Sequence, residues 1–229
     1  MFLGKQTLIN LAFLMVGIGL GIGGLKIKQA TQSQLPPTPI VGPGAVQYDI
    51  EVDRQVARSQ LTDGAALFFG DSHTVALAIS TVTARGENFG ISSDTLDGLS
   101  TRLPRYKIDK ACAVILEIGT NNIQKEADNG FARKYGRLFD HIPTTTPIIA
   151  VAIFPFLDPQ YSAAVHTANL SIASACRSRP NCRVLDISDR LKADGQLDDR
   201  NYDSDRIHLS SRGTALWVEA LKASIPNCR

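Results

Sequence analysis

Short apolar runs alternate with amphipathic stretches along the chain from about residue 47 onward. The runs at 65–69, 111–118 and 147–154 have the length of buried strands. Their alternation with helical spacing is typical of a parallel sheet covered by helices on both faces. The pattern therefore predicts an α/β fold, a three-layer α/β/α sandwich with a mainly parallel sheet. It also predicts strands ending at 90 and covering 183–187, and helices over 53–61, 74–82, 94–103, 131–141, 160–177 and 210–225.

The N-terminal segment has a different pattern. Its apolar run, Leu8 to Leu25, contains one polar side chain, that of Asn10. As a helix this run would span about 27 Å, close to the thickness of a bilayer core. Lys26 and Lys28 follow at once, whereas a cleaved secretory signal usually ends in small residues. We therefore expect a retained transmembrane helix within residues 1–30, with a cleaved signal as the alternative.

Residues 31–46 are rich in Pro, Gly and small polar side chains, which is typical of a linker. Residues 47–229 are then expected to form a single globular domain. The chain carries 24 basic and 22 acidic residues, and the basic excess comes from the lysines of the N-terminal segment. The nearly balanced charge of the domain indicates no nucleic-acid partner.

Four segments with chemically useful residues follow predicted strands. Gly70-Asp71-Ser72 comes directly after the first buried run, and Gly90 ends the next short strand. Gly119-Thr120-Asn121 follows the second buried run, and the segment from Asp203 to His208 lies after the last strand. Because the carboxyl ends of parallel strands meet at one edge of a sheet, these segments are expected to gather there.

Ser72, Asp205 and His208 are the candidate catalytic residues. A serine hydroxyl becomes an effective nucleophile when an imidazole takes its proton, and His208 is the candidate base. Asp205 lies three residues earlier and could orient the imidazole and stabilise its charged form. Asp203 is the alternative acid.

Attack by serine on a carbonyl group creates an oxyanion, which needs preorganised hydrogen-bond donors. The candidate donors are the backbone N–H groups of Ser72 and Gly90 and the side-chain amide of Asn121. Glycine at position 90 would also let the backbone approach a substrate closely.

Together the four segments resemble the sequence blocks of the SGNH, or GDSL, hydrolase family, over about residues 67 to 221. The resemblance implies a flavodoxin-like sandwich with the same triad and the same oxyanion donors. The matching blocks are Gly70-Asp71-Ser72, Asn88-Phe89-Gly90, Gly119-Thr120-Asn121 and Asp205 to His208.

Three residues depart from the family's usual pattern. His73 replaces an apolar residue after the serine, Ser93 stands where a second glycine often lies, and Asn122 replaces an aspartate. None of them is a candidate catalytic group. We expect His73 to line the pocket.

The resemblance implies a metal-free esterase, lipase, thioesterase or carbohydrate deacetylase. We therefore expect a serine hydrolase that cleaves an acyl ester of a small molecule, lipid or carbohydrate through an acyl-serine intermediate. An acyltransferase would use the same triad while excluding water, and a catalytically silent binding module would keep only the fold. The chain has neither paired C-x-x-C motifs nor histidines at metal-ligand spacing, so no metal or other cofactor is expected.

The four cysteines can pair in three ways. Cys176 ends a predicted helix and Cys182 begins the next strand, so we expect them to pair at the non-catalytic edge of the sheet. Cys112 begins a strand and Cys228 follows the last helix, which suggests the second pair; a reduced, buried Cys112 is the alternative. Two disulfides would require an oxidising space. The domain is therefore expected outside the cytoplasm, anchored to the membrane or, after cleavage of the N-terminal segment, secreted or periplasmic.

Overall fold

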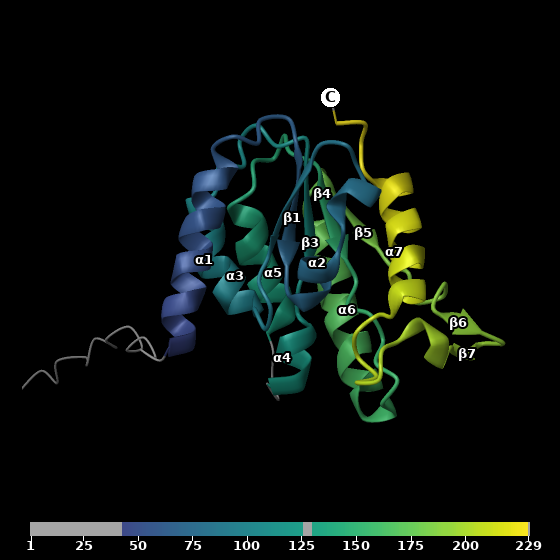
Figure 1. Cartoon of the computed structure of the whole chain (residues 1–229). Helices are drawn as coiled ribbons and strands as arrows, with labels where there is room; N and C mark the ends of the chain where they lie inside the picture. Colours follow the sequence, from purple (N-terminus) through teal and green to yellow (C-terminus); the bar gives the residue numbers. More distant parts are fainter. Residues whose placement is uncertain (1–42, 126–129, 229) are drawn as a thin grey trace, which may run out of the picture. The chain divides into compact units, whose positions relative to one another are not determined.

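The computed structural model describes residues 43–125 and 130–228, and Figure 1 shows the arrangement of their helices and strands. The predicted transmembrane helix lies outside these residues, as does most of the predicted linker. Within the described ranges, no helix is both long and apolar enough to cross a membrane.

Five parallel strands form the central sheet, in the order β2-β1-β3-β4-β5. The chain passes from β1 to β2 on one side and then returns to β3 on the other. The ends of β1 and β3 therefore flank the point where the strand order reverses, which is where ligands bind in such sheets. The strands are β1 (Ala66–Gly70), β2 (Gly86–Gly90), β3 (Ala113–Glu117), β4 (Ile148–Val151) and β5 (Cys182–Leu185).

Helices cover both faces of the sheet, because successive strand side chains point to opposite faces and both sets are apolar. In β1, Leu67 and Phe69 belong to one buried cluster and Ala66 and Phe68 to another. The predicted three-layer sandwich with a parallel sheet is confirmed. The Phe69 side is covered by α1 (Pro43–Ser59), α3 (Leu96–Arg102), α5 (Phe131–Asp140) and α6 (Ser162–Arg177), and the Phe68 side by α2 (Ser72–Ala76) and α7 (Ser211–Ser224).

Several predicted boundaries are wrong, and the helix predicted over 53–61 is α1, which begins earlier, at Pro43. The helix predicted over 74–82 is interrupted, because Leu77 takes an extended backbone conformation with ψ 120°, and a short 3-10 helix, η1 (Ile79–Thr81), follows. The linker predicted to reach residue 46 ends earlier, because α1 begins at Pro43. The fixed φ of proline suits the first position of a helix. The sequence did not predict α4 (Thr120–Lys125), β6 (Lys192–Ala193), β7 (Gln196–Leu197) or the 3-10 helix η4 (Asp199–Asn201).

Both predicted disulfides are confirmed. Cys176 pairs with Cys182, which joins the end of α6 to the start of β5. Cys112 pairs with Cys228, which joins the chain just before β3 to the segment after α7. Both bonds lie at the amino ends of their strands, so they lie at the edge of the sheet opposite the residues that follow β1 and β3.

Candidate active site

The candidate nucleophile lies where β1 passes into α2. Ser72 is the first residue of the helix, and its hydroxyl oxygen lies 2.7 Å from Nε2 of His208. The turn before it is tight, since a side chain at Gly70 would meet the carbonyl oxygen of Glu117 at 2.1 Å. Glycine therefore allows the strand to lead directly into a helix that presents the serine hydroxyl.

The loop that carries His208 is closed by its own hydrogen bonds. Nδ1 of His208 lies 2.5 Å from Oδ2 of Asp205. Oδ1 of Asp205 accepts hydrogen bonds from the backbone N–H groups of Ile207, at 3.0 Å, and His208, at 2.9 Å. Asp203 donates its own N–H to the His208 carbonyl oxygen at 2.8 Å, so Asp205 supplies the carboxylate partner of the imidazole. The structure thus brings Ser72, His208 and Asp205 into one chain of contacts.

Asp205 is held in its ionised form. Partial burial raises its pKa, but hydrogen bonds from the His208 side chain and from the backbone N–H groups of Ile207 and His208 outweigh this effect. The pKa of Asp205 is thereby lowered to about 2. A carboxylate that stays charged can fix the tautomer of the ring, with the hydrogen on Nδ1 and the lone pair of Nε2 toward Ser72.

Asn121 lies at the start of α4, directly after β3, in a buried position. Its Nδ2 donates a hydrogen bond to the carbonyl oxygen of Asp94 at 3.0 Å, which orients the amide. A side-chain amide has two hydrogens. Within the described part of the chain the second hydrogen has no acceptor, so it is available to a ligand.

Gly90 has a different role from the predicted one. Its N–H donates to Oδ1 of Asn88 at 2.9 Å, and its carbonyl oxygen accepts from Nε2 of Gln55 at 3.0 Å. A side chain here would meet the backbone nitrogen of Val75 at 2.7 Å. Gly90 therefore allows α2 to pack against β2. Its N–H is occupied inside the protein, which argues against the predicted role as an oxyanion donor.

The backbone N–H group of Ser93 is free among the described residues, unlike that of Gly90. It lies in an exposed turn after β2 with φ 63°, in the left-handed region that non-glycine residues seldom adopt. One end of the turn is held by the Ile91 N–H on the Gly70 carbonyl oxygen, at 3.0 Å, and the other by Asn121 on Asp94. No group in the described ranges accepts from the Ser93 N–H. The sequence signal for a candidate oxyanion donor at this position is a serine where a second glycine is usual in the family.

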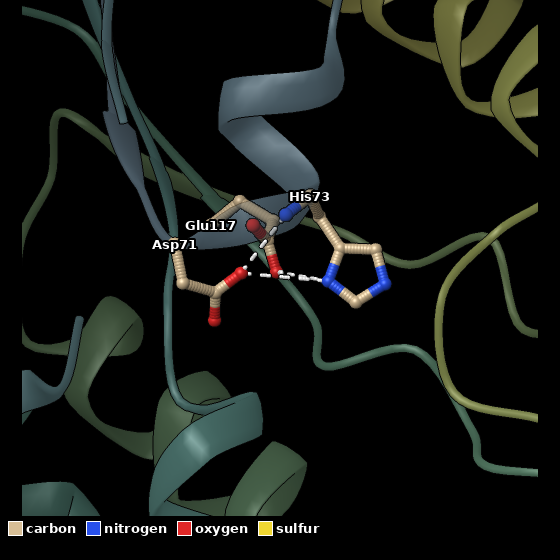
Figure 2. Close-up of side chains that lie close together, drawn as sticks. All are labelled: Asp71, His73 and Glu117. Carbon is tan, nitrogen blue, oxygen red and sulfur yellow. Dashed lines mark hydrogen bonds and ion pairs between the residues drawn. The ribbon is translucent and has the colours of Figure 1, made fainter. Parts of the chain in front are cut away.

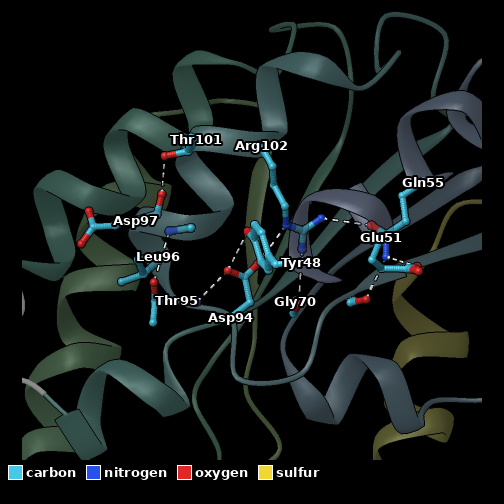
Figure 3. A network of polar contacts seen from close by, with 12 residues as sticks. Tyr48, Glu51, Gln55, Gly70, Asp94, Thr95, Leu96, Asp97, Thr101 and Arg102 are labelled. Carbon is cyan, nitrogen blue, oxygen red and sulfur yellow. Dashed lines mark hydrogen bonds and ion pairs between the residues drawn. The ribbon is translucent and has the colours of Figure 1, made fainter. Parts of the chain in front are cut away.

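A buried ion pair supports this turn (Figure 3). Nε of Arg102 donates to Oδ2 of Asp94 at 2.9 Å, and the two side chains are 2% and 1% exposed. The guanidinium also donates to the Tyr106 hydroxyl at 3.0 Å and reaches the Gly70 carbonyl oxygen at 3.5 Å. Tyr48 of α1 donates to Oδ1 of Asp94 at 3.2 Å. The network therefore joins α1 to the turn that carries Ser93 and to the end of β1 just before Ser72.

One cluster within the described residues has the side-chain types of a metal site (Figure 2). Asp71, His73 and Glu117 are buried, and one possible ligand atom from each lies within 4.8 Å of the others. Two carboxylates and one imidazole are a donor set that divalent metals accept. His73 was predicted to line the pocket, and it borders a cavity of about 110 Å³ together with His208 and Trp217.

Comparison with known proteins gives consistent matches. The model of the GDSL-like lipase/acylhydrolase family matches residues 61–216. A GDSL-like lipase from Bacteroides thetaiotaomicron has 15% identity and a TM-score of 0.61, over 76% of this chain and 96% of that one. An acetyl xylan esterase from Geobacillus stearothermophilus has 18% identity and a TM-score of 0.59, over 71% and 94%. The C-terminal catalytic domain of a Streptococcus pneumoniae peptidoglycan O-acetyltransferase has 15% identity and a TM-score of 0.56, over 70% and 91%. None of the curated proteins matches the chain in sequence.

Proposed function

The chain belongs to the GDSL-like lipase/acylhydrolase family, and on this basis we propose that it is a serine ester hydrolase that forms an acyl enzyme on Ser72. The observation that carries the proposal is the 2.7 Å contact between Ser72 Oγ and His208 Nε2, side chains that lie 136 residues apart in the chain. A nucleophile within hydrogen-bond reach of a base, with the base oriented by a third group, is the arrangement that acyl transfer requires.

In the proposed acylation step, Ser72 Oγ attacks the ester carbonyl carbon while His208 Nε2 takes the hydroxyl proton. The carbonyl oxygen becomes an oxyanion, and its collapse breaks the bond to the alcohol, which leaves with the proton from His208. Asp205 accepts the Nδ1–H bond and stabilises the imidazolium between these two transfers. Water then attacks the acyl-Ser72 ester by the same route, and the acid leaves as Ser72 recovers its proton.

The pH profile of ester hydrolysis is expected to have a single acid limb. Activity requires a His208 imidazole that can take the Ser72 proton, so it is expected to be lost in acid, where the ring already carries a proton. Asp205, with its pKa lowered to about 2, adds no second limb at moderately acidic pH. Measurement of kcat/KM from about pH 4 to about pH 9 tests this expectation. A second ionisation required for activity near pH 5 would contradict it.

We assign the oxyanion hole to the backbone N–H groups of Ser72 and Ser93 and the Asn121 amide. Asn121→Ala is expected to lower kcat by about 10²- to 10³-fold with little change in KM, since the oxyanion exists only in the transition state and intermediate.

A matched control separates this effect from a loss of folding. The Asn181 amide donates to the Pro143 carbonyl oxygen at 3.2 Å, at the edge of the sheet opposite Ser72. Asn181→Ala should reduce the melting temperature and leave kcat at the wild-type level in the folded protein. Equal kcat values for the two alanine variants would remove Asn121 from the oxyanion hole.

The proposed substrate is an acyl ester of a small molecule, lipid or carbohydrate. The carbohydrate alternative is favoured by the acetyl xylan esterase and the peptidoglycan O-acetyltransferase among proteins of the same fold. The peptidoglycan O-acetyltransferase also makes acyl transfer to an alcohol a candidate reaction. Transfer would use the same acyl-Ser72 intermediate, with a sugar hydroxyl in place of water.

Hydrolysis of p-nitrophenyl esters from acetate to palmitate tests the function and its acyl preference together. Wild-type protein is expected to release p-nitrophenol with a preference for one acyl chain length. Addition of an oligosaccharide acceptor then distinguishes transfer from hydrolysis, because transfer gives an acylated oligosaccharide that is detected by its mass. Folded protein that cleaves none of these esters and also transfers no acyl group would favour the binding-module alternative.

We further propose that the domain works outside the cytoplasm, either anchored by a helix within residues 1–30 or released after cleavage. The two disulfides support an oxidising compartment. Membrane fractionation of the expressed full chain, followed by sequencing of its N-terminus, distinguishes the anchored form from the released form.

A further inference from the structure

A second imidazole lies against the proposed catalytic base. His73 directly follows the nucleophile, is 5% exposed, and has its ring centroid 4.9 Å from that of His208, with an angle of 34° between the ring planes. Its ring also packs edge-on against Phe154 at 5.1 Å. The His73 ring is buried, whereas the His208 side chain is 39% exposed, so a charge on the far side of His73 reaches His208 through a buried ring and is screened by water only on the outer side of His208.

Two carboxyl groups lie on that far side (Figure 2). Nδ1 of His73 is 3.4 Å from Oδ1 of Asp71 and 3.9 Å from Oε1 of Glu117. The three side chains are almost completely buried, and four of their polar atoms have no hydrogen-bond partner in the described structure: Asp71 Oδ2, Glu117 Oε1 and both ring nitrogens of His73. Buried polar groups at such distances are stabilised only if protons are shared among them.

Glu117 holds one of these protons. Its pKa is raised well above the ordinary value by burial and, next, by the neighbouring Asp71, although a hydrogen bond from Thr74 opposes the rise. Protonated Glu117 is neutral and can donate to Asp71. The negative charge of the pair therefore resides on Asp71, whose Oδ1 also accepts the His73 backbone N–H at 3.1 Å.

The contacts of His73 also indicate where its ring hydrogen lies. Nδ1 faces carboxyl oxygens, which are acceptors, whereas Nε2 has no acceptor among the described residues. A single hydrogen on Nδ1 satisfies both observations and leaves the ring neutral. Asp71, Glu117 and His73 together then carry one negative charge.

We propose that Asp71 and His73 form a second carboxylate–imidazole pair, stacked on His208, whose buried negative charge stabilises the imidazolium that His208 becomes when it takes the Ser72 proton. This inference rests on the proposed function. Asp71 and His73 are positioning residues in this scheme, because they act on the reacting atoms only through His208.

The buried pair supplements a triad carboxylate that water partly screens. The Asp205 side chain is 47% exposed, whereas that of Asp71 is completely buried. The other titratable groups nearby are on neighbouring elements. Asp203 borders the cavity beside the two rings. Burial raises the pKa of Tyr135 in α5, and the nearby Asp71 carboxylate raises it further. Neither Asp203 nor Tyr135 takes part in the contacts that link Asp71 through His73 to His208.

Two isosteric variants of the full-length chain separate the roles of the carboxyl groups. Asp71→Asn removes the negative charge, so the His208 ring should take up its proton only at a lower pH than in the wild-type protein. Glu117→Gln reproduces the neutral, protonated side chain, so the pKa of His208 should stay at the wild-type value.

The primary readout is an NMR titration of the His208 ring, which the presence of four histidines in the chain makes tractable. The titration requires no turnover, so it tests the inference even if the chain hydrolyses no ester. If the chain does hydrolyse an ester, the acid limb of kcat/KM should move to lower pH in Asp71→Asn and remain in place in Glu117→Gln. If Asp71→Asn does not fold, His73→Leu is the second variant. It leaves the buried Asp71 carboxylate without the imidazole N–H that stabilises its charge, so the limb should shift in the same direction.

Two outcomes would overturn the inference. The first is a folded Asp71→Asn or His73→Leu protein in which the NMR titration of the His208 ring is the same as in the wild type. A Glu117→Gln protein whose His208 titration moves as far as that of Asp71→Asn would count equally. The second is one equivalent of a divalent metal in the purified protein, found by elemental analysis and lost in Glu117→Gln. That result would make the cluster a metal site, with both carboxylates ionised.

Discussion

Ser72→Ala is expected to lower kcat/KM for ester hydrolysis by at least about 10⁴-fold, because the acyl enzyme can no longer form. Among residues 43–125 and 130–228, the side chain of Ser72 forms a hydrogen bond only with His208, so its loss should leave the fold intact. The rate of ester cleavage by purified wild-type and variant protein, each checked for an unchanged melting temperature, measures the effect.

An exposed serine provides the matched control for this variant. Ser92 lies in the turn next to Ser93, and its side chain is exposed. Ser92→Ala is therefore expected to hydrolyse the same ester at the wild-type rate. A Ser72→Ala protein that retains more than about a tenth of wild-type activity would show that another group is the nucleophile.

Arg102→Ala is expected to destabilise the domain by about 3–5 kcal/mol, because it leaves the Asp94 carboxylate buried without its charged partner. The same substitution removes the hydrogen bond to Tyr106 and the contact with the Gly70 carbonyl oxygen. Urea unfolding of both proteins measures the difference in the free energy of unfolding.

The nearby Arg105 is the matched control. It forms an ion pair with Asp53 at 2.6 Å, in which the two side chains are 47% and 67% exposed. Exposed pairs of this kind contribute little, so Arg105→Ala should unfold at nearly the wild-type urea concentration. Equal losses for the two arginines would mean that the buried network is not what stabilises the turn around Ser93.

The strands and the contact between Ser72 and His208 could be predicted from the sequence for a common physical reason. A strand buried on both faces needs an uninterrupted apolar run, so Ala66–Gly70 and Ala113–Glu117 could be located without knowledge of their partners. The residues after each run then had to share one edge of the sheet. Ser72 and His208 meet there, although nothing in the local sequence of either specifies the other.

The proposed oxyanion hole could be predicted only in part. A glycine at the end of a strand was interpreted as a donor, but the Gly90 N–H is taken by Asn88, two residues earlier. The left-handed backbone of Ser93 depends on contacts of its turn with Gly70 and Asn121, which lie far away in the sequence. Backbone conformation imposed by such distant contacts leaves little trace in local composition.

Two other features depend on long-range or very local information. The contribution of α1 through Tyr48 involves a partner 46 residues away, so periodicity could not reveal it. The β6–β7 hairpin, by contrast, had a local signal. Asp194-Gly195 adopts φ 53° and 80°, as a tight hairpin turn requires, but its strands have only two residues each and show no alternation.

The most direct test of the account is covalent labelling of the native protein with a fluorophosphonate, read by intact mass and by mapping of the labelled peptide. One adduct per chain is expected, on the oxygen of Ser72, with labelling abolished in Ser72→Ala and strongly slowed in His208→Ala. An unlabelled native protein, or an adduct on any other residue, would contradict the assignment of Ser72 as the nucleophile.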